Sequence, residues 1–221
     1  GRRFLGITDV AEMLAVIDAA AGGTAAIPLP TAAPLPDPWA GVATDGRTAG
    51  AGDAVVTVEL WVDYQAAGIA TLGGVLEPAL VDEIEAGTVR LERYDLALLG
   101  TESETAAVAV RCVERQDASG WFVHDILGAS GGQGTATGLF TDANLLRLAS
   151  RLRLDVAAFA ACLPSEDVLA EVRADTAAGR ALGYEAAPVV IVRSGGVQQA
   201  RFAGTIDTGA VLAAVTAAAG G

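Results

Sequence analysis

The chain has 221 residues, of which 52% are hydrophobic and 19% are charged. This length and composition suffice for one large or two small packed domains and exclude disorder throughout. Its 27 acidic residues outnumber the 14 basic ones, and the resulting net charge of −13 disfavours binding to nucleic acid or to anionic lipid surfaces. No apolar run approaches the ~18 to 20 residues of a membrane span.

The N-terminal part divides into a helical and an extended stretch. Residues 8–23 predict an amphipathic helix with Asp9 as its candidate N-cap. Five of the eight prolines lie between positions 28 and 38, so residues 24–53 are expected to be extended and without helix. This extended stretch is either a linker or an arm that packs on the main domain or on a second copy of the chain.

The first strand signal is the run from Val55 to Val62, which contains one charged residue and is typical of a strand buried on both faces. After a break at 65–71, apolar residues recur at helical spacing up to Gly87. Pro78 lies inside this run and is expected to kink the helix. Val89 to Tyr94 then predicts a second strand with alternating side chains.

Between residues 101 and 185 the sequence predicts only helices. We expect them at roughly 102–116, 120–128, 142–152, 155–163 and 166–182. Thr141, Asp155 and Ser165 stand where N-caps belong. Strand signals return at 189–192 and 197–202 around a turn at 194–196, which predicts a hairpin, and a closing helix follows.

The predicted order is therefore strand, helix, strand, helical block, hairpin and helix. A right-handed crossover joins the first two strands in parallel, and the hairpin adds two antiparallel strands. The fold class is α/β: a thioredoxin-like fold with an all-helical domain inserted after the second strand, plus an N-terminal helix and proline-rich arm. The predicted division is 1–53 for the N-terminal helix and arm, 54–100 and 186–221 for the two parts of the thioredoxin-like domain, and 101–185 for the inserted helical domain.

Several segments carry a family resemblance by their order and spacing. They are Trp61–Gln65, Val75–Leu80, Val108–Gln116, Phe122–Leu127, Gly138–Asp142, Asp155–Leu163, and Ala178–Gly183 leading into Ala187-Pro188. Over about residues 54–221 the chain resembles the DsbA-like thiol-disulfide oxidoreductases, the thioredoxin-like group with an inserted helical domain.

The resemblance places the two redox cysteines of that family at positions 66 and 69. This chain has Ala66 and Ile69 there, with Ala67 and Gly68 between them. Thiol-disulfide exchange requires a thiolate, so the usual reaction of the family is excluded at this site. A related branch, the kappa-class glutathione transferases, uses a hydroxyl instead, and positions 66–69 contain no hydroxyl either.

What the resemblance leaves is a binding groove between the 65–71 loop and Pro188, which is similar to the cis-proline of the family. The expected ligand-binding residues are Tyr64, Gln65, Gly68, Ala187 and Pro188. The expected ligand is an extended peptide, a partner protein or a small anion. Three alternatives stay open: a relic site held only by packing, a thioredoxin-family enzyme that uses a non-standard site, and a homodimer formed through the N-terminal arm.

Cys112 and Cys162 are the two cysteines of the chain and lie on different predicted helices. Their spacing excludes a CxxC motif and a zinc knuckle. The resemblance implies a structural disulfide between them, and two buried, reduced thiols are the alternative. A disulfide implies an oxidising, extracytoplasmic compartment. The protein is then secreted or membrane-anchored, with the signal or anchor segment absent from this sequence.

The remaining candidate residues predict no chemistry. His124 is the only histidine, and its apolar neighbours at helical spacing indicate a packed or capping residue rather than a catalytic one. The acidic residues are scattered and form no calcium or zinc motif, so we expect no metal and no cofactor. Asp63 ends the buried strand beside the loop and is expected only to hydrogen-bond it.

Overall fold

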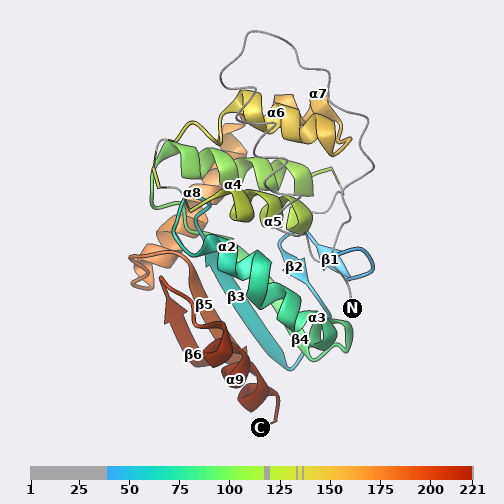
Figure 1. Ribbon diagram of the computed structural model, residues 1–221, viewed down its shortest axis with the longest axis vertical. Helices are drawn as coiled ribbons and strands as arrows, with labels where there is room; N and C mark the ends of the chain where they lie inside the picture. The colour runs from blue at the N-terminus through green and yellow to red at the C-terminus, as the bar shows by residue number, and fades with distance from the viewer. Residues whose placement is uncertain (1–38, 117–119, 133, 136, 221) are drawn as a thin grey trace.

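The computed structural model describes residues 39–116, 120–132, 134–135 and 137–220. In this part of the chain, a mixed sheet lies against a group of helices (Figure 1). The strand order is β1-β2-β4-β3-β5-β6. The strands are β1 (Thr44–Asp45), β2 (Thr48–Ala49), β3 (Val56–Val62), β4 (Val89–Asp95), β5 (Val189–Ser194) and β6 (Val197–Ala203). The helix predicted over 8–23 and the proline-rich residues up to 38 lie outside the described residues.

The centre of the sheet is β3, which lies between β4 and β5 as its apolar sequence predicts. It runs parallel to β4, with Val58 opposite Leu91, and antiparallel to β5, with Val58 opposite Val192. β5 and β6 form the predicted hairpin. Because β3 has a neighbour on each side and helices over its faces, the side chains of Val56, Val58 and Leu60 are completely buried.

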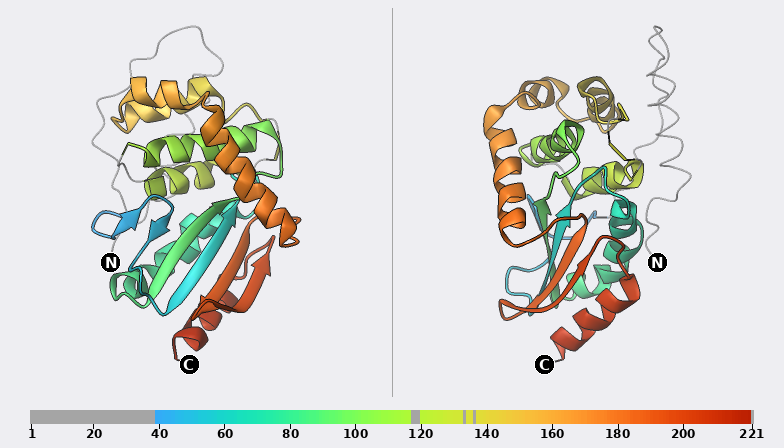
Figure 2. Two further views of the ribbon diagram at one scale, coloured as in Figure 1. Left: turned by 180° about the vertical axis from the view of Figure 1, so that it is seen from behind. Right: turned by 90° about the vertical axis from the view of Figure 1, so that its left-hand side faces the viewer.

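Helices cover both faces of the sheet (Figure 2). On one face, α3 (Glu77–Glu85) packs on β4, and α9 (Thr208–Ala219) packs on β3, β5 and β6. On the other face, α8 (Glu166–Ala181) packs on β4. Gly179 permits this approach, because a Cβ atom there would lie 2.7 Å from Leu96 Cδ1 and 3.2 Å from the Trp61 ring.

The predicted helical block is confirmed between β4 and β5. It consists of α4 (Thr101–Glu114), α5 (Gly120–Ser130), α6 (Asp142–Arg151), α7 (Val156–Cys162) and α8. The side chains of Thr141, Asp155 and Ser165 accept backbone hydrogen bonds at the starts of α6, α7 and α8, so the three predicted N-caps are confirmed. A disulfide between Cys112 and Cys162 joins α4 to α7.

Pro78 does not lie in the middle of one regular helix, which corrects the prediction of a simple kink. The chain passes from α2 (Ile69–Thr71) into a π-helical segment, η1 (Leu72–Leu76), and then into α3. Pro78 occupies the first turn of α3. A proline is tolerated there because its missing N–H is not needed for an α-helical hydrogen bond. The helical run is therefore interrupted by the π-helical segment η1 before Pro78 rather than kinked at Pro78.

The described end of the predicted arm belongs in part to the sheet. β2 pairs antiparallel with β4, with Ala49 opposite Leu91. Trp39 is only 2% exposed, and its ring centre lies 5.0 Å from that of Trp121 in α5. Residues 39–53 contain no helix, as expected, and the strands within residues 44–49 extend the sheet.

Candidate functional site

The loop that resembles the redox motif lies between β3 and α2. Ala66 and Ile69 are 5% and 1% exposed, whereas Ala67 is exposed and Gly68 is partly exposed. The sequence contains two cysteines, and both are in the disulfide between α4 and α7. The loop therefore offers no thiol, and no free thiol exists elsewhere in the chain to replace it.

Gly68 is where this loop approaches Pro188. It has a φ of 92°, a conformation that favours glycine. A Cβ atom at this position would lie 3.3 Å from the Gly204 carbonyl oxygen and 3.7 Å from Pro188 Cδ. The Ala187–Pro188 peptide bond is cis, and the Pro188 carbonyl accepts a 2.9 Å hydrogen bond from the Gly204 amide. Three backbone segments thus meet at the expected groove.

Two of the five expected ligand-binding residues, Tyr64 and Gln65, have side chains turned into the protein. Tyr64 is fully buried, and its hydroxyl accepts a 2.8 Å hydrogen bond from Arg93. Gln65 is 2% exposed, and its side-chain amide donates to Glu102 and to the Gly134 carbonyl. These polar atoms are satisfied inside the molecule. Pro188 is buried, so Gly68 and Ala187 are the expected ligand-binding residues that are partly exposed.

Some of the backbone N–H groups that were expected to attract an anion already donate hydrogen bonds within the loop. The amide of Ile69 donates to the Ala66 carbonyl at 3.3 Å, and the amide of Thr71 donates to the Gly68 carbonyl at 3.0 Å. α2 has three residues before the π-helical segment begins. The geometry therefore favours recognition of a backbone over capture of a small anion.

Asp63 holds the start of the 65–71 loop in place by hydrogen bonds. Its Oδ2 atom accepts hydrogen bonds from the amides of Leu98 and Leu99 at 2.7 and 2.9 Å. Its Oδ1 atom accepts from the Gln65 amide at 2.8 Å and the Ser103 hydroxyl at 2.6 Å. Because the carboxylate is fully buried and has four donors, it links the end of β3 to the start of α4. This agrees with the structural role expected for it.

A buried polar cluster lies behind the loop, and the sequence reasoning missed most of it. His124 is 1% exposed, with Nδ1 at 2.9 Å from the Tyr64 hydroxyl and Nε2 at 3.1 Å from Glu77 Oε1. Asp125 Oδ2 accepts a 2.7 Å hydrogen bond from Trp39 Nε1. The packed role expected for His124 agrees with this burial. One feature of the sequence could have indicated that Glu77 is buried. It occupies a position on the apolar face of the helix that continues through Leu80 and Ile84.

Burial dominates the electrostatics of this cluster. It raises the pKa of Glu77 to about 7 and lowers the pKa of His124 to about 3. Burial and then the neighbouring Glu77 carboxyl raise the pKa of Asp125 well above its usual range. All three shifts favour neutral side chains, because a charge inside the protein loses its hydration.

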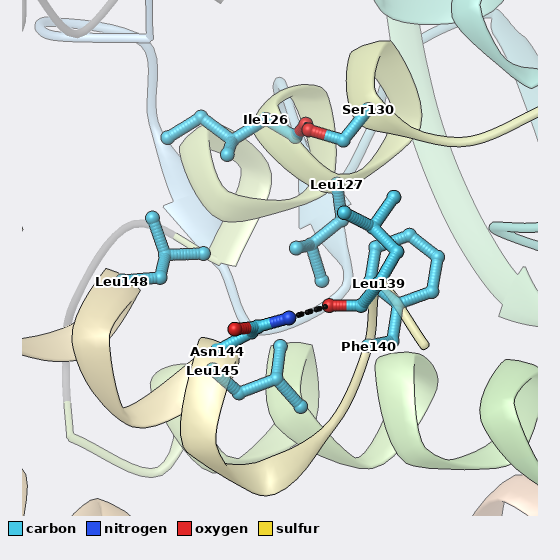
Figure 3. A pocket seen from close by; sticks show the side chains of 8 residues that line it. All are labelled: Ile126, Leu127, Ser130, Leu139, Phe140, Asn144, Leu145 and Leu148. Atoms are coloured by element: carbon cyan, nitrogen blue, oxygen red, sulfur yellow. Dashed lines mark hydrogen bonds between the residues drawn. The ribbon is translucent and has the colours of Figure 1, made fainter. Parts of the chain in front are cut away.

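Two cavities lie in the helical block. The smaller, of about 10 Å³, lies among α5, α6 and residues 139–140 (Figure 3). Asn144 donates a 3.0 Å hydrogen bond to the Leu139 carbonyl beside it. The larger has about 280 Å³ and includes the Glu104–Arg173 ion pair in its lining. The first has room for at most about one water molecule, and neither has the groove residues in its lining.

A parallel β3–β4 pair, an antiparallel β5–β6 hairpin that follows a cis-proline, and a helical insertion define a thioredoxin fold. The family model described as thioredoxin matches residues 43–207, about three quarters of the chain. The chain therefore belongs to the thioredoxin family. Among the curated proteins, none matches it.

Solved structures share this fold at low sequence identity. Wolbachia pipientis alpha-DsbA1 has a TM-score of 0.68 and 15% identity, over 88% of this chain and 94% of that one. Bacillus subtilis BdbD has a TM-score of 0.69 and 20% identity, over 80% and 94%. A thioredoxin-like oxidoreductase from Silicibacter pomeroyi has a TM-score of 0.62 and 23% identity, over 79% and 92%. At these identities the likeness establishes the fold.

Among the helices of the described residues, none has the length and apolar character needed to cross a membrane.

Proposed function

We propose that this protein is a redox-inactive member of its family that binds an extended peptide segment of a partner protein between the 65–71 loop and Pro188. The observation that carries the proposal is the combination of a thiol-free loop with a preserved close approach of Gly68 to Pro188. Disulfide exchange needs a thiolate, whereas pairing with a peptide backbone does not.

The groove suits a peptide because its borders are backbone and small side chains. Ala187 is half-buried, and no hydrogen bond to its amide or carbonyl is found among the described residues. An extended strand can pair with these groups, as in other cases of β-strand addition. Ala67, the neighbour of Gly68 in the loop, is exposed and carries only a methyl group.

The disulfide supports an extracytoplasmic location for this activity. Cys112 and Cys162 join two helices of the insertion and close a loop of fifty positions. Disulfides of this structural kind persist in oxidising compartments and are rare in the reducing cytosol. We therefore place the proposed partner among secreted or cell-surface proteins.

A thiol-free probe tests the proposal. The probe is fluorescein-labelled insulin B chain with carboxymethylated cysteines, an extended peptide that cannot exchange disulfides. When the wild-type protein is added, we expect the fluorescence anisotropy of the probe to rise and to saturate. Gly68→Val should weaken this binding at least about tenfold, because its side chain fills the space toward Gly204 and Pro188.

Gly195→Val is the matched control. Gly195 also has a positive φ, of 57°, but lies in the β5–β6 turn, where no atom lies within 4 Å of the place that a Cβ atom would take. It should bind the probe like the wild type. Absence of saturable binding, or equal loss in both variants, contradicts the proposed groove.

The competing enzyme hypothesis makes a different prediction at the same place. A glutathione-using relative has to bind glutathione near position 66, where the structure offers no side-chain hydroxyl or thiol. Titration calorimetry with reduced glutathione is expected to give no heat of binding. A saturable heat of glutathione binding that is lost in Gly68→Val would favour the enzyme hypothesis instead.

A further inference from the structure

We infer that Glu77, His124 and Asp125 form a binding site for a divalent transition-metal cation, behind the groove and independent of it. The three side chains come from α3 and α5, and each offers one ligand atom within 4.8 Å of the other two. Glu77 is fully buried, and His124 and Asp125 are 1% and 8% exposed.

The distances fit coordination. His124 Nε2 and Glu77 Oε1 are 3.1 Å apart. Ligand atoms about 2.0 to 2.2 Å from one metal ion are about 3 to 3.5 Å apart in octahedral or tetrahedral geometry. An ion between these two atoms therefore needs little movement of either side chain. One imidazole with two carboxylates is a donor set of Zn²⁺, Mn²⁺ or Fe²⁺, whereas Mg²⁺ and Ca²⁺ prefer oxygen alone.

Two buried carboxyl oxygens have no donor other than each other's carboxyl group. Glu77 Oε2 and Asp125 Oδ1 accept no hydrogen bond from another kind of group among the described residues, and the Glu77 and Asp125 carboxyls hydrogen-bond to each other, which requires a proton on one of them. Buried carboxylate oxygens are normally paired, because desolvation without a partner is costly. A divalent cation would replace the protons that burial favours on these two carboxyls and would satisfy both oxygens.

The surrounding groups already hold the ligands in place. Trp39 donates to Asp125 Oδ2, which leaves Oδ1 as the atom that faces the site. Tyr64 contacts His124 Nδ1 at 2.9 Å, so Nδ1 can carry the ring proton while Nε2 binds the metal. Such hydrogen bonds to metal-bound histidine and carboxylate groups orient the ligands and strengthen binding.

The π-helical segment borders the cluster. Gly73 is partly exposed, and a Cβ atom there would lie 2.6 Å from Asp125 Oδ1. The absence of a side chain at this position therefore allows the segment to pack closely against the carboxyl group. π-helical turns of this kind occur frequently at functional sites.

Metal titration of the full chain tests the inference. After treatment with EDTA, native mass spectrometry with Zn²⁺ should show one tightly bound ion, and Zn²⁺ should raise the thermal midpoint. Mg²⁺ and Ca²⁺ should do neither. Glu77→Gln and Asp125→Asn keep the shape of the side chains and should each raise the Zn²⁺ dissociation constant at least about tenfold. Glu83→Gln, an exposed acidic residue on the same helix, should leave the constant unchanged.

A pair of glycine variants tests the geometry without removing a ligand. Gly73→Ala should weaken Zn²⁺ binding because its Cβ displaces Asp125 Oδ1, whereas Gly74→Ala has open space and should bind like the wild type. Absence of Zn²⁺ binding at millimolar concentration, or binding that is equal in the ligand variants and in Glu83→Gln, overturns the inference. Peptide binding in metal-free buffer is a separate readout, so either proposal can fail without the other.

Discussion

At the scale of single residues, the 65–71 loop differs from a redox site because residues 66–69 have neither thiol nor hydroxyl groups. Ala66, Ala67, Gly68 and Ile69 have no group that exchanges electrons or holds a thiolate. The polar residues around them are used for structure instead. Asp63 shows this most clearly, because four donors converge on one buried carboxylate.

Replacement of Asp63 by Asn should destabilise the protein by about 2 kcal/mol, since the amide NH2 would face donors that now reach a carboxylate oxygen. Urea denaturation followed by circular dichroism measures this change. Asp82→Asn, on the exposed side of α3, is the control and should stay within about 0.5 kcal/mol of wild type. Equal stability of both variants would contradict the assigned role of Asp63.

At the scale of the elements, helix starts are governed by local capping. Asp155 accepts a 2.9 Å hydrogen bond from the Ala158 amide at the start of α7. This helix has only seven residues and carries Cys162 at its end. Its position therefore affects the attachment of the disulfide.

We expect Asp155→Ala to lower the free energy of unfolding by about 1 kcal/mol, the usual cost of a lost N-cap. Asp155→Asn keeps a capping oxygen and should change it by less than half as much. Guanidinium denaturation of both variants with the disulfide intact provides the comparison. If Asn were as damaging as Ala, capping would not explain the effect.

The same locality explains which elements the sequence predicts well. Some elements depend only on residues within a few positions of one another, so the local sequence is enough to predict them. These are the N-caps Thr141 and Ser165, the hairpin and the buried strand β3. The buried cluster is different. Glu77 and His124 are 47 positions apart and meet only after α5 packs on η1, which directly precedes α3.

The inward orientation of Tyr64 and Gln65 could not be predicted for a related reason. Both residues lie beyond the end of β3, after Asp63, where alternation ends and the sequence no longer tells which side faces solvent. Their partners, Arg93 and Glu102, come from β4 and α4. The strands β1 and β2 were not predicted because they have two residues each, too few to give a periodic pattern.

At the scale of the whole molecule, the disulfide joins parts of the insertion that are far apart in sequence. A cross-link that closes a loop of fifty positions restricts the unfolded chain, and in the chain-entropy model this is worth about 4 kcal/mol. The insertion in turn packs on η1 and the sheet, so loss of the bond affects the framework of the loop.

Reduction by dithiothreitol should therefore lower the free energy of unfolding by about 2 to 4 kcal/mol. Denaturation curves with and without the reductant measure the difference. The Cys112→Ala/Cys162→Ala variant should have the stability of the reduced protein and should not respond to dithiothreitol. A response of this variant would mean that the reductant acts elsewhere.

The most direct test of a thiol-free site in this fold is the reduction of insulin by dithiothreitol, followed by turbidity. We predict the same rate with and without the protein, because neither Ala66 nor Ile69 can form a mixed disulfide and both cysteines are held in a helix-to-helix bond. A rate above that of dithiothreitol alone would contradict a redox-inactive protein.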